Sequence, residues 1–415
     1  MKRLYQFVTA IVICALGMSS YAFAQMEADS IEMGGGYAND VYYSLENGEI
    51  LTVDRTNWDI AFYTVTWSAG IIINEGNGVE LRVYPNADTA GWSSVDTTGL
   101  STWPRLYNSP EMWEDGAFNR SATNHPNYGW GVYNTITHDV VGDSIYILTF
   151  NEAPAKKIWI ERKISTANTY MFKYADLDGS NEVSETVTCS DFTSKNFLYY
   201  SLQNQEVLDR EPASESWDLL FTKYVAMLPG NVPYPVTGVL LNEDVPANRF
   251  DEVGPDFDDW SSVPFDSTKV PIGYDWKYFD MSIFSYVVED SIAFFVSDRQ
   301  TNVYKLVFNA FDYTIGKFVF DKSMISAAGL FEAKQADQFY LYPNPANGFV
   351  NLETINGMLP DAISIMDLSG REVYRANDVN QTTRLDLGDL PNGMYLVMLM
   401  AGEEQHVQKL LIQNN

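Results

Sequence analysis

The sequence predicts an all-β protein made of a duplicated β domain followed by a small β-sandwich. Three observations lead to this fold class: the composition, an internal repeat, and a change of pattern near residue 339. Tyr, Phe, Trp, Val, Ile and Thr are frequent, and long apolar stretches with a helical period are scarce, which favours strands. The 415 residues suffice for two or three domains, and 46% hydrophobic residues can build real cores.

One block of sequence occurs twice, and most of the chain is arranged around its two copies. Each copy contains Trp-Asp, then apolar residues and Phe, and follows a strand-like segment with Tyr-Tyr-Ser-Leu. The matched pairs are 41–50 with 198–207, 58–62 with 217–221, 70–75 with 238–243, and 140–145 with 287–292. Matched blocks in one order indicate a tandem duplication, with a repeat of about 130 to 150 residues, the usual size of a domain.

The net charge of −29 limits the classes of partner. An acidic surface keeps a protein soluble and repels phosphate backbones, so nucleic-acid binding is not expected. The same charge is unsuited to electrostatic adsorption on anionic lipid.

The first residues have the pattern of an export signal. Lys2 and Arg3 precede an apolar run at 7–16 that is too short to span a bilayer, and Ala22-Phe23-Ala24 is a small-x-small cleavage site. We therefore assign residues 1–24 to a signal peptide, with export into the periplasm. Cleavage also removes Cys14, so the mature chain retains Cys189 alone. No internal disulfide or cysteine metal cluster is expected, and Cys189 is predicted to be a small core residue.

The first repeat, residues 25–185, begins with a polar segment at 25–37 that we expect to be a flexible lead. Strands are predicted at 42–50, 58–66, 70–74 and 145–148, with a tight turn at Asn47-Gly48 in the first. The strand at 58–66 is apolar almost throughout, as in strands buried on both faces. Between these strands, residues 84–130 form a long irregular excursion, and such insertions are often binding sites.

The second repeat, residues 186–327, should follow the same plan, with its irregular stretch at 226–275. Each repeat closes with two strand-like runs, at 157–164 and 170–174 in the first and at 302–308 and 317–320 in the second. Residues 328–338 are predicted to be a linker.

Residues 339–415 alternate short strands with Gly, Pro, Asn and Asp turns, which is typical of a small Ig-like β-sandwich. Three motifs occur in order: Tyr-Pro-Asn-Pro, then an Asp-x-x-Gly-Arg turn, then Leu-Pro-x-Gly-x-Tyr before the closing strand. The residues that carry them are Tyr342, Pro343, Asn344, Pro345, Gly370, Arg371, Gly393 and Lys409.

With these motifs the segment resembles the type A C-terminal sorting domain of the type IX secretion system of Bacteroidetes. The resemblance implies a second export step across the outer membrane, with the secretion machinery as partner. It also implies removal of the domain there, and release of the protein or its attachment to the cell surface. The alternative is an ordinary Ig-like module, because a fold alone does not fix a function.

Each repeat resembles the HmuY family of secreted haem-binding proteins. The residues that carry the resemblance are Tyr43-Ser44-Leu45, Gly48-Glu49, 57–62, 70–74, Gly129-Trp130 and the strand from Ile145. It spans roughly residues 38–180 and, more weakly, 195–322. These are mostly core and turn residues, so the resemblance implies an all-β domain more directly than it implies a ligand.

The resemblance makes haem the candidate cofactor, held by two axial histidines in the family; imidazole suits iron. Here the candidates are His138 and His125, which are closer in sequence than the family's ligands. The second repeat has no histidine, so a site there would need Met281 or Tyr286. The alternative is that His125 and His138 are surface polar residues.

Catalytic signatures are not found in the sequence. It contains no Gly-x-Ser-x-Gly, no His-Glu-x-x-His and no phosphate loop, and no spacing selects a pair of carboxylates for glycoside hydrolysis. Asp176-Leu177-Asp178-Gly179 with Glu185 partly matches a calcium loop, but Tyr174 stands at its first position, so a polar hairpin loop is favoured and no metal site is assigned. The aromatic segments 103–113 and 260–276 suit stacking on a sugar or porphyrin, or packing in a core.

Two hypotheses of function follow, neither of them enzymatic. In the first, the protein is a secreted or outer-membrane surface protein that captures a ligand, haem first, with haem or an outer-membrane receptor as its expected partner. In the second, the same fold is a structural or adhesive surface protein without haem.

Overall fold

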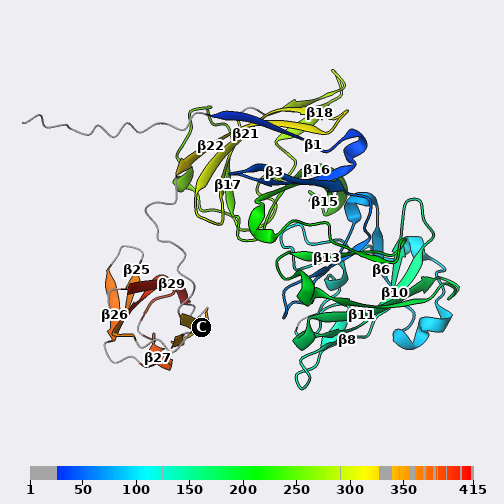
Figure 1. Cartoon of the computed structure of the whole chain (residues 1–415), viewed down its shortest axis with the longest axis horizontal. Helices are drawn as coiled ribbons and strands as arrows, with labels where there is room; N and C mark the ends of the chain where they lie inside the picture. The colour runs from blue at the N-terminus through cyan, green and yellow to red at the C-terminus, as the bar shows by residue number, and fades with distance from the viewer. Residues whose placement is uncertain are drawn as a thin grey trace, which may run out of the picture. The chain divides into compact units, whose positions relative to one another are not determined.

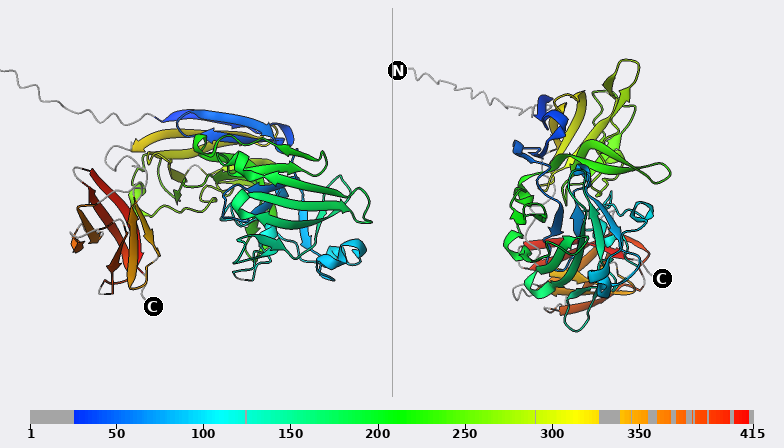
Figure 2. Two further views of the ribbon diagram at one scale, coloured as in Figure 1. Left: turned by 60° about the horizontal axis from the view of Figure 1, so that its bottom comes forward. Right: turned by 90° about the vertical axis from the view of Figure 1, so that its right-hand side faces the viewer.

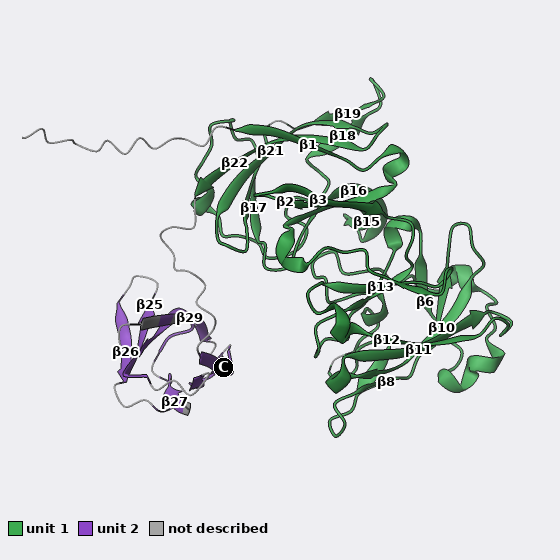
Figure 3. Ribbon diagram, viewed as in Figure 1, with its two compact units in different colours: residues 1–327 green, residues 328–415 purple. Residues whose placement is uncertain are grey.

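Antiparallel strands joined by short 3-10 turns make up nearly all the regular structure, which confirms the all-β prediction. The computed structural model describes residues 26–326 except 124 and 290, and residues 339–412 except 345, 355–359, 368–370, 377–379, 381, 389 and 402–403. The chain divides into two units, residues 1–327 and 328–415 (Figure 3). The predicted signal peptide and linker lie outside the described residues. No helix of the described part is long and apolar enough to cross a membrane.

The two repeats exchange their first hairpins. The hairpin of the first repeat is β2 (Asn39–Ser44) and β3 (Gly48–Asp54), and that of the second is β13 (Phe197–Ser201) and β14 (Glu206–Leu208). β2 pairs with β15 (Leu219–Leu228) of the second repeat, whereas β13 pairs with β4 (Ile60–Tyr63) of the first. With the edge strands β5 (Ile71–Ile73) and β16 (Val232–Leu241), the two sheets have the orders β14-β13-β4-β5 and β16-β15-β2-β3.

The exchange is symmetric to the residue. Tyr43 lies opposite Leu219 in one sheet, and its repeat counterpart Tyr200 lies opposite Ile60 in the other. Because the side-chain period of a strand is two, this common register places matched residues on matched faces.

Each half is completed by a longer antiparallel sheet. In the first, β12-β11-β10-β8-β7 is extended by β9, which pairs with β10 and β6. Its strands are β6 (Glu80–Val83), β7 (Gly131–Tyr133), β8 (Val140–Gly142), β9 (Tyr146–Thr149), β10 (Lys156–Ile164), β11 (Thr169–Asp176) and β12 (Val183–Thr188). In the second, the order is β1-β22-β21-β20-β17. Its strands are β1 (Glu27–Glu32), β17 (Ala247–Phe250), β20 (Ala293–Ser297), β21 (Val303–Asp312) and β22 (Lys317–Ser326), beside a separate hairpin of β18 (Lys277–Asp280) and β19 (Ser285–Val288).

The expectation of a flexible lead at 25–37 is wrong, because β1 pairs along its whole length with β22. Figures 1 and 2 show the blue strand β1 beside the yellow strands β21 and β22 from the end of the second repeat. The polar composition did not indicate a strand because β1 lies at the edge of its sheet. Its one buried hydrophobic side chain is Ile31, and Met33 just after the strand is buried as well.

The packing units therefore differ from the sequence repeats. One core draws its buried residues from 60–202, and the other from 31–45 together with 219–320. We call residues 56–210 half A, and residues 26–55 with 211–326 half B. Half A is one continuous piece of chain, whereas half B is closed by a segment from the N-terminal side.

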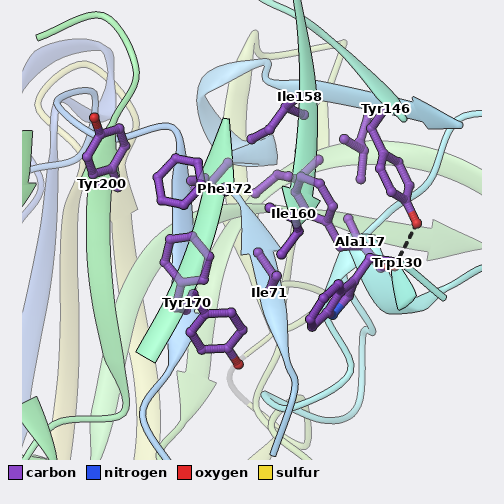
Figure 4. Packing of buried hydrophobic residues seen from close by; sticks show 14 of the residues in the cluster. Ile71, Ala117, Trp130, Tyr146, Ile158, Ile160, Tyr170, Phe172 and Tyr200 are labelled. Atoms are coloured by element: carbon purple, nitrogen blue, oxygen red, sulfur yellow. Dashed lines mark hydrogen bonds between the residues drawn. The ribbon is translucent and has the colours of Figure 1, made fainter. Parts of the chain in front are cut away.

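The core of half A is built on aromatic side chains. Figure 4 shows Tyr170 and Phe172 of β11 on one side of Ile160, and Trp130 and Tyr146 on the other side. Phe62 packs against Tyr170 and Phe172 with ring centroids 4.7 and 5.3 Å apart. Cys189 is fully buried in this cluster, which confirms the prediction of a small core residue.

The two irregular excursions have different outcomes. The regular structure of the described residues in 84–130 is limited to 3-10 turns, as predicted: η3 (Thr89–Ser94), η4 (Leu100–Thr102) and η5 (Ala117–Asn119). The irregular stretch predicted at 226–275 is wrong as far as residue 250, because β15 continues to Leu228, pairs with β16, and is followed by β17. β16 accommodates Pro233 and Pro235 because it is an edge strand, where proline is tolerated.

The remaining 3-10 turns are η1 (Gly35–Tyr37), η2 (Glu75–Asn77), η6 (Ser165–Ala167), η7 (Cys189–Phe192), η8 (Ser214–Ser216) and η9 (Trp260–Ser262).

The C-terminal unit is a β-sandwich of two sheets, β23-β24-β27 and β26-β25-β28-β29, around its own core. The strands are β23 (Phe339–Tyr342), β24 (Phe349–Thr354), β25 (Ala362–Asp367), β26 (Glu372–Ala376), β27 (Thr382–Asp386), β28 (Gly393–Ala401) and β29 (Glu404–Ile412).

Candidate functional site

The two candidate haem ligands lie close together in half A, His125 in the loop before β7 and His138 in the loop between β7 and β8. Tyr133 stands between them, with its ring centroid 5.6 Å from that of His125 and 6.0 Å from that of His138. The Tyr133 hydroxyl and His138 Nδ1 are 2.6 Å apart. Both imidazoles are exposed to solvent, and neither lines the cleft described next. Among the described residues, no group of three or more His, Cys, Asp or Glu side chains could hold a metal ion.

A cleft of ≈ 700 Å³ lies where half A meets half B. Residues 105–111 of the long irregular excursion form one wall, and β15 with the loop 270–275 forms the other. Its aromatic lining consists of Tyr107, Tyr224 and Tyr274. Ligand-binding clefts commonly have this size and mix of aromatic and polar groups.

Two asparagines hold the half A wall in place. Asn108 accepts a hydrogen bond from the Ile73 N–H at 3.0 Å and donates to the Ile73 carbonyl at 2.8 Å, as a neighbouring strand would. Asn119 accepts from the Ile71 N–H at 3.0 Å and donates to the Ala69 carbonyl at 3.0 Å. Because β5 is an edge strand with free backbone groups, these amides cover its edge and fix the irregular segment across it.

The half B wall is held by backbone pairing. The Val239 N–H donates to the Gly273 carbonyl at 2.9 Å, and the Gly273 N–H donates back at 3.1 Å. Gly273 adopts a φ of 61°, and a Cβ at Gly238 would meet its carbonyl oxygen at 2.4 Å. The close approach therefore depends on both glycines.

Glu75 lies beside the cleft and joins the two halves through hydrogen bonds. Its carboxylate accepts the Val225 N–H of β15 at 3.1 Å and the Asn108 N–H at 3.0 Å. Burial raises the pKa of Glu75, while these two N–H groups and the charge of Lys269 act in the opposite direction. Burial also lowers the pKa of Lys269, opposed by Glu75.

Trp113 is a structural residue beside Lys269. Its indole Nε1 donates to the Leu241 carbonyl at 3.0 Å, and the Lys269 ammonium lies 4.6 Å from its ring centroid. Trp260 stacks on Phe265, and Trp276 is fully buried in half B. These three tryptophans of the aromatic segments thus pack within the protein.

Three of the four charged side chains along the cleft have ion-pair partners, and Glu111 is the fourth. Arg105 pairs with Glu80 at 2.6 Å, and Arg120 forms an ion pair with Asp115. Asp275 pairs with Arg249 at 2.5 Å. The cleft therefore presents tyrosine faces and polar groups without a strong charge of either sign. The sequence located the excursion that forms one wall, but the second wall comes from the other repeat and has no sequence motif.

The partial calcium motif is a hairpin loop between β11 and β12, as favoured from the sequence. Asp176 is paired with Lys156 at 3.0 Å and accepts from Asn181 at 2.6 Å, and Asp178 accepts from the Ser180 hydroxyl at 2.6 Å. These side-chain hydrogen bonds lower the pKa of both aspartates. The carboxylates thus serve the turn itself.

The motifs of the C-terminal unit hold its turns. Asn344 donates to the Lys409 carbonyl at 2.9 Å and accepts from the Leu411 N–H at 2.9 Å, so it joins the bend that follows β23 to β29. Arg371 pairs with Asp367 at 3.0 Å across the turn between β25 and β26.

Gly393 opens β28, and two residues later the Tyr395 hydroxyl donates to the Pro391 carbonyl at 2.9 Å. This bond accounts for the Leu-Pro-x-Gly-x-Tyr spacing. Pro345 and Gly370 lie outside the described residues.

No curated protein matches the chain. The resemblance of the repeats to the HmuY family therefore stays a prediction. In contrast, residues 340–413 match the family described as the secretion system C-terminal sorting domain, so the chain carries the tail that directs proteins through the type IX secretion system to the cell surface or beyond.

Proposed function

We propose that the exported part of this protein is a non-enzymatic binding protein whose cleft between the halves holds a neutral carbohydrate chain. The observation that supports this proposal is the lining: Tyr107, Tyr224 and Tyr274 around ≈ 700 Å³, among polar side chains whose charges are paired except for that of Glu111. Tyrosine offers an apolar ring face together with a hydroxyl, which matches the apolar faces and hydroxyls of sugars.

The test uses the mature chain and a panel of oligosaccharides. We expect a neutral glycan to bind, and Tyr107→Ala or Tyr274→Ala to weaken binding by about tenfold or more, as for buried aromatic anchors. Tyr234→Ala is the matched control, because Tyr234 is 55% exposed on β16 and does not line the cleft. If no glycan binds, or if the control weakens binding equally, the proposal fails and a structural or adhesive surface role takes its place.

Haem capture is the second candidate, because the structure brings His125 and His138 to one tyrosine. The geometry differs from a closed haem pocket, since both rings are exposed. In half B, Met281 is 68% exposed and Tyr286 packs against Phe311, with ring centroids 5.0 Å apart.

If haem binds, His138→Ala should abolish or shift the Soret band of the complex without changing the circular dichroism, and His125→Ala should have a smaller effect. A protein with no saturable haem spectrum, or a His138→Ala variant with an unchanged one, would contradict this candidate.

Export by the type IX system has its own test. Deletion of residues 339–415 should leave the protein in the periplasm, because the signal peptide still acts while the sorting tail is missing. We propose that the tail is removed on export, so mass spectrometry of the surface and medium fractions should find few peptides from it. Normal surface delivery of the truncated chain would contradict the role of the tail.

A further inference from the structure

A second, smaller cavity of ≈ 60 Å³ lies between the halves, beside the cleft. Four cationic side chains and two carboxylates line it, although the whole chain has a net charge of −29. They are Arg55, Arg210, Lys223 and Lys269, with Asp40 and Glu75. Aromatic rings, including Trp58 and Tyr199, form much of the remaining wall.

Both carboxylates are already engaged. Asp40 accepts from Arg210 at 2.8 Å and from the Thr222 hydroxyl at 2.6 Å. Glu75 accepts the two backbone N–H groups that join the halves, from Val225 and Asn108. The cations that line the cavity therefore outnumber its carboxylates by four to two, while two further carboxylates, Asp54 and Glu211, interact with Arg55 and Arg210 from outside the lining.

Two of the guanidinium groups keep unused donors. Arg55 is 5% exposed, and its Nε donates to the Tyr37 carbonyl at 2.9 Å, but its buried Nη1 has no hydrogen-bond partner among the described residues. Arg210 is 4% exposed, and its Nε is likewise without a partner in the described part of the chain. It is unfavourable to leave a buried charged donor unpaired, so such a donor calls for a ligand or a water as its partner.

The cations also act on one another. Burial, and after it the charge of Arg55, lowers the pKa of Lys223. Burial lowers the pKa of Arg55 too, although Asp40 and Asp54 oppose the effect. A negative charge placed among these groups would raise the pKa of Lys223 and the pKa of Arg55.

The duplication shows that one cation of this cluster is not shared by the two copies. Thr64 occupies the position of Lys223, two residues after the matched Phe62 and Phe221. The arginines are less distinctive, since Arg55 and Arg210 each follow an aspartate after the first hairpin of their repeat. The shared fold therefore does not require Lys223, since the other half forms its matching sheet without it.

We propose that the cavity is a binding site for a small oxyanion, a carboxylate, phosphate or sulfate group, held by Arg55 with Lys223 and Arg210. A guanidinium fork pairs with such groups through two parallel hydrogen bonds. The cavity volume of ≈ 60 Å³ has room for a small anion, because a single water needs only ~10–15 Å³. Lys223 belongs to half B and Arg210 to half A, so the anion would link the two halves. This site goes beyond the proposed carbohydrate function and does not depend on it.

The experiment is titration calorimetry of the mature chain with sodium phosphate, sodium sulfate and sodium acetate, in a buffer free of other oxyanions. We expect saturable binding of at least one of them, and an affinity about tenfold or more lower in Arg55→Gln and in Lys223→Met. Lys223→Met guards against misfolding, because the Lys223 ammonium makes no hydrogen bond within the described part of the chain and the side chain of the variant keeps an apolar stem. Circular dichroism checks the fold of both variants.

Arg105→Gln is the matched control, because Arg105 lines the cleft but not this cavity. Its anion affinity should equal that of the parent protein, while Arg55→Gln should leave glycan binding unchanged. An anomalous peak from soaked selenate within hydrogen-bond distance of Arg55 Nη1 would support the site directly. The proposal is overturned by the absence of saturable binding, by parental affinity in folded Arg55→Gln and Lys223→Met, or by an equal loss in Arg105→Gln.

Discussion

Half A and half B are alike where they exchange strands and unlike where their sheets end. In each, a buried aspartate accepts the N–H of a leucine from the exchanged hairpin: Asp59 from Leu202 and Asp218 from Leu45, both at 2.7 Å. In each, a tryptophan packs edge-on against a tyrosine of that hairpin with centroids 5.0 Å apart, Trp58 on Tyr199 and Trp217 on Tyr42.

Further details follow the same symmetry. Asn74 donates to the Trp58 carbonyl at 2.9 Å, and Asn242 donates to the Trp217 carbonyl at 2.8 Å. Even an unusual feature is shared, because neither indole N–H of these two buried tryptophans has a hydrogen-bond partner within the described part of the chain.

The free edges show the difference. The short β5 is covered by the side chains of Asn108 and Asn119, whereas the long β16 is covered by the backbone around Gly273. Exchange contacts are buried and reciprocal, so a change on one side needs a compensating change on the other. A sheet edge can be covered by different segments. The cleft and the cationic cavity both lie where the segment around Asn108 meets the segment around Gly273 and the end of β15.

The exchange predicts a large difference between two fragments. Residues 56–210 contain all strands of half A and should fold alone, whereas residues 25–185 should not, because β1 and β2 would lack β22 and β15. Thermal unfolding by circular dichroism and amide dispersion in NMR spectra would measure this. Residues 211–326 should become structured only when a peptide of residues 26–55 is added. Cooperative unfolding of 25–185 with an unstructured 56–210 would contradict the exchange.

The aspartates test whether the two exchanges are equally important. Asp59→Ala and Asp218→Ala each leave a buried N–H without its acceptor, at an expected cost of about 1–3 kcal/mol in the free energy of unfolding. Denaturant unfolding of both variants gives the two costs, with Asp191→Ala in a 3-10 turn as an exposed control. A large loss in one half and none in the other would show that the symmetry of the contacts is not a symmetry of stability.

The sequence predicted the duplication, the all-β class and the sorting tail because these depend on local patterns. The Trp-Asp blocks and the Tyr-Tyr-Ser-Leu hairpins were identified as matched elements, and their strands are present. The sequence could not predict which hairpin pairs with which Trp-Asp strand, because the residues of the two copies are interchangeable. Tyr43 lies opposite Leu219, and its counterpart Tyr200 lies in the same way opposite Ile60.

The candidate sites were harder to predict for the same reason. Histidines are noticed in a sequence because they are rare, and His125 and His138 do come together around Tyr133. Of the groups at the interface, Arg55 directly follows β3 and Lys223 lies in β15, both in segments of ordinary pattern, and only the exchange brings them to one cavity. A single signal was present: Lys223 has a threonine, Thr64, as its repeat counterpart.

Gly76 tests the fit between the halves more finely. A Cβ on this residue would meet the Lys223 carbonyl oxygen at 2.0 Å, so Gly76→Ala must push η2 away from β15. Overpacking of this kind costs about 1–3 kcal/mol. Gly254→Ala is the control, because a Cβ there would meet nothing within 4 Å. Equal stability of the two variants in denaturant unfolding would mean that the halves separate easily at this contact.

The smallest expected effect concerns the pH dependence of half B. Lys277 lies under the ring of Trp276, with its ammonium 4.2 Å from the ring centroid and 2.7 Å from the Thr237 carbonyl. Burial lowers the pKa of Lys277 from 10.5 to about 7, with Asp275 opposing. Between these two values the unfolded chain binds the proton and the folded chain does not, so raising the pH through this window stabilises the folded state.

This contribution amounts to at most about 1.4 kcal/mol per pH unit. In Lys277→Met the apolar stem is kept and the titrating group is lost, so the rise of unfolding free energy from neutral pH toward pH 10 should become smaller than in the parent. The difference between the two proteins isolates Lys277 from the other groups that titrate in this range. Parallel stability curves for the parent and Lys277→Met would show that Lys277 stays charged in the folded state, held by the Thr237 carbonyl and the ring of Trp276.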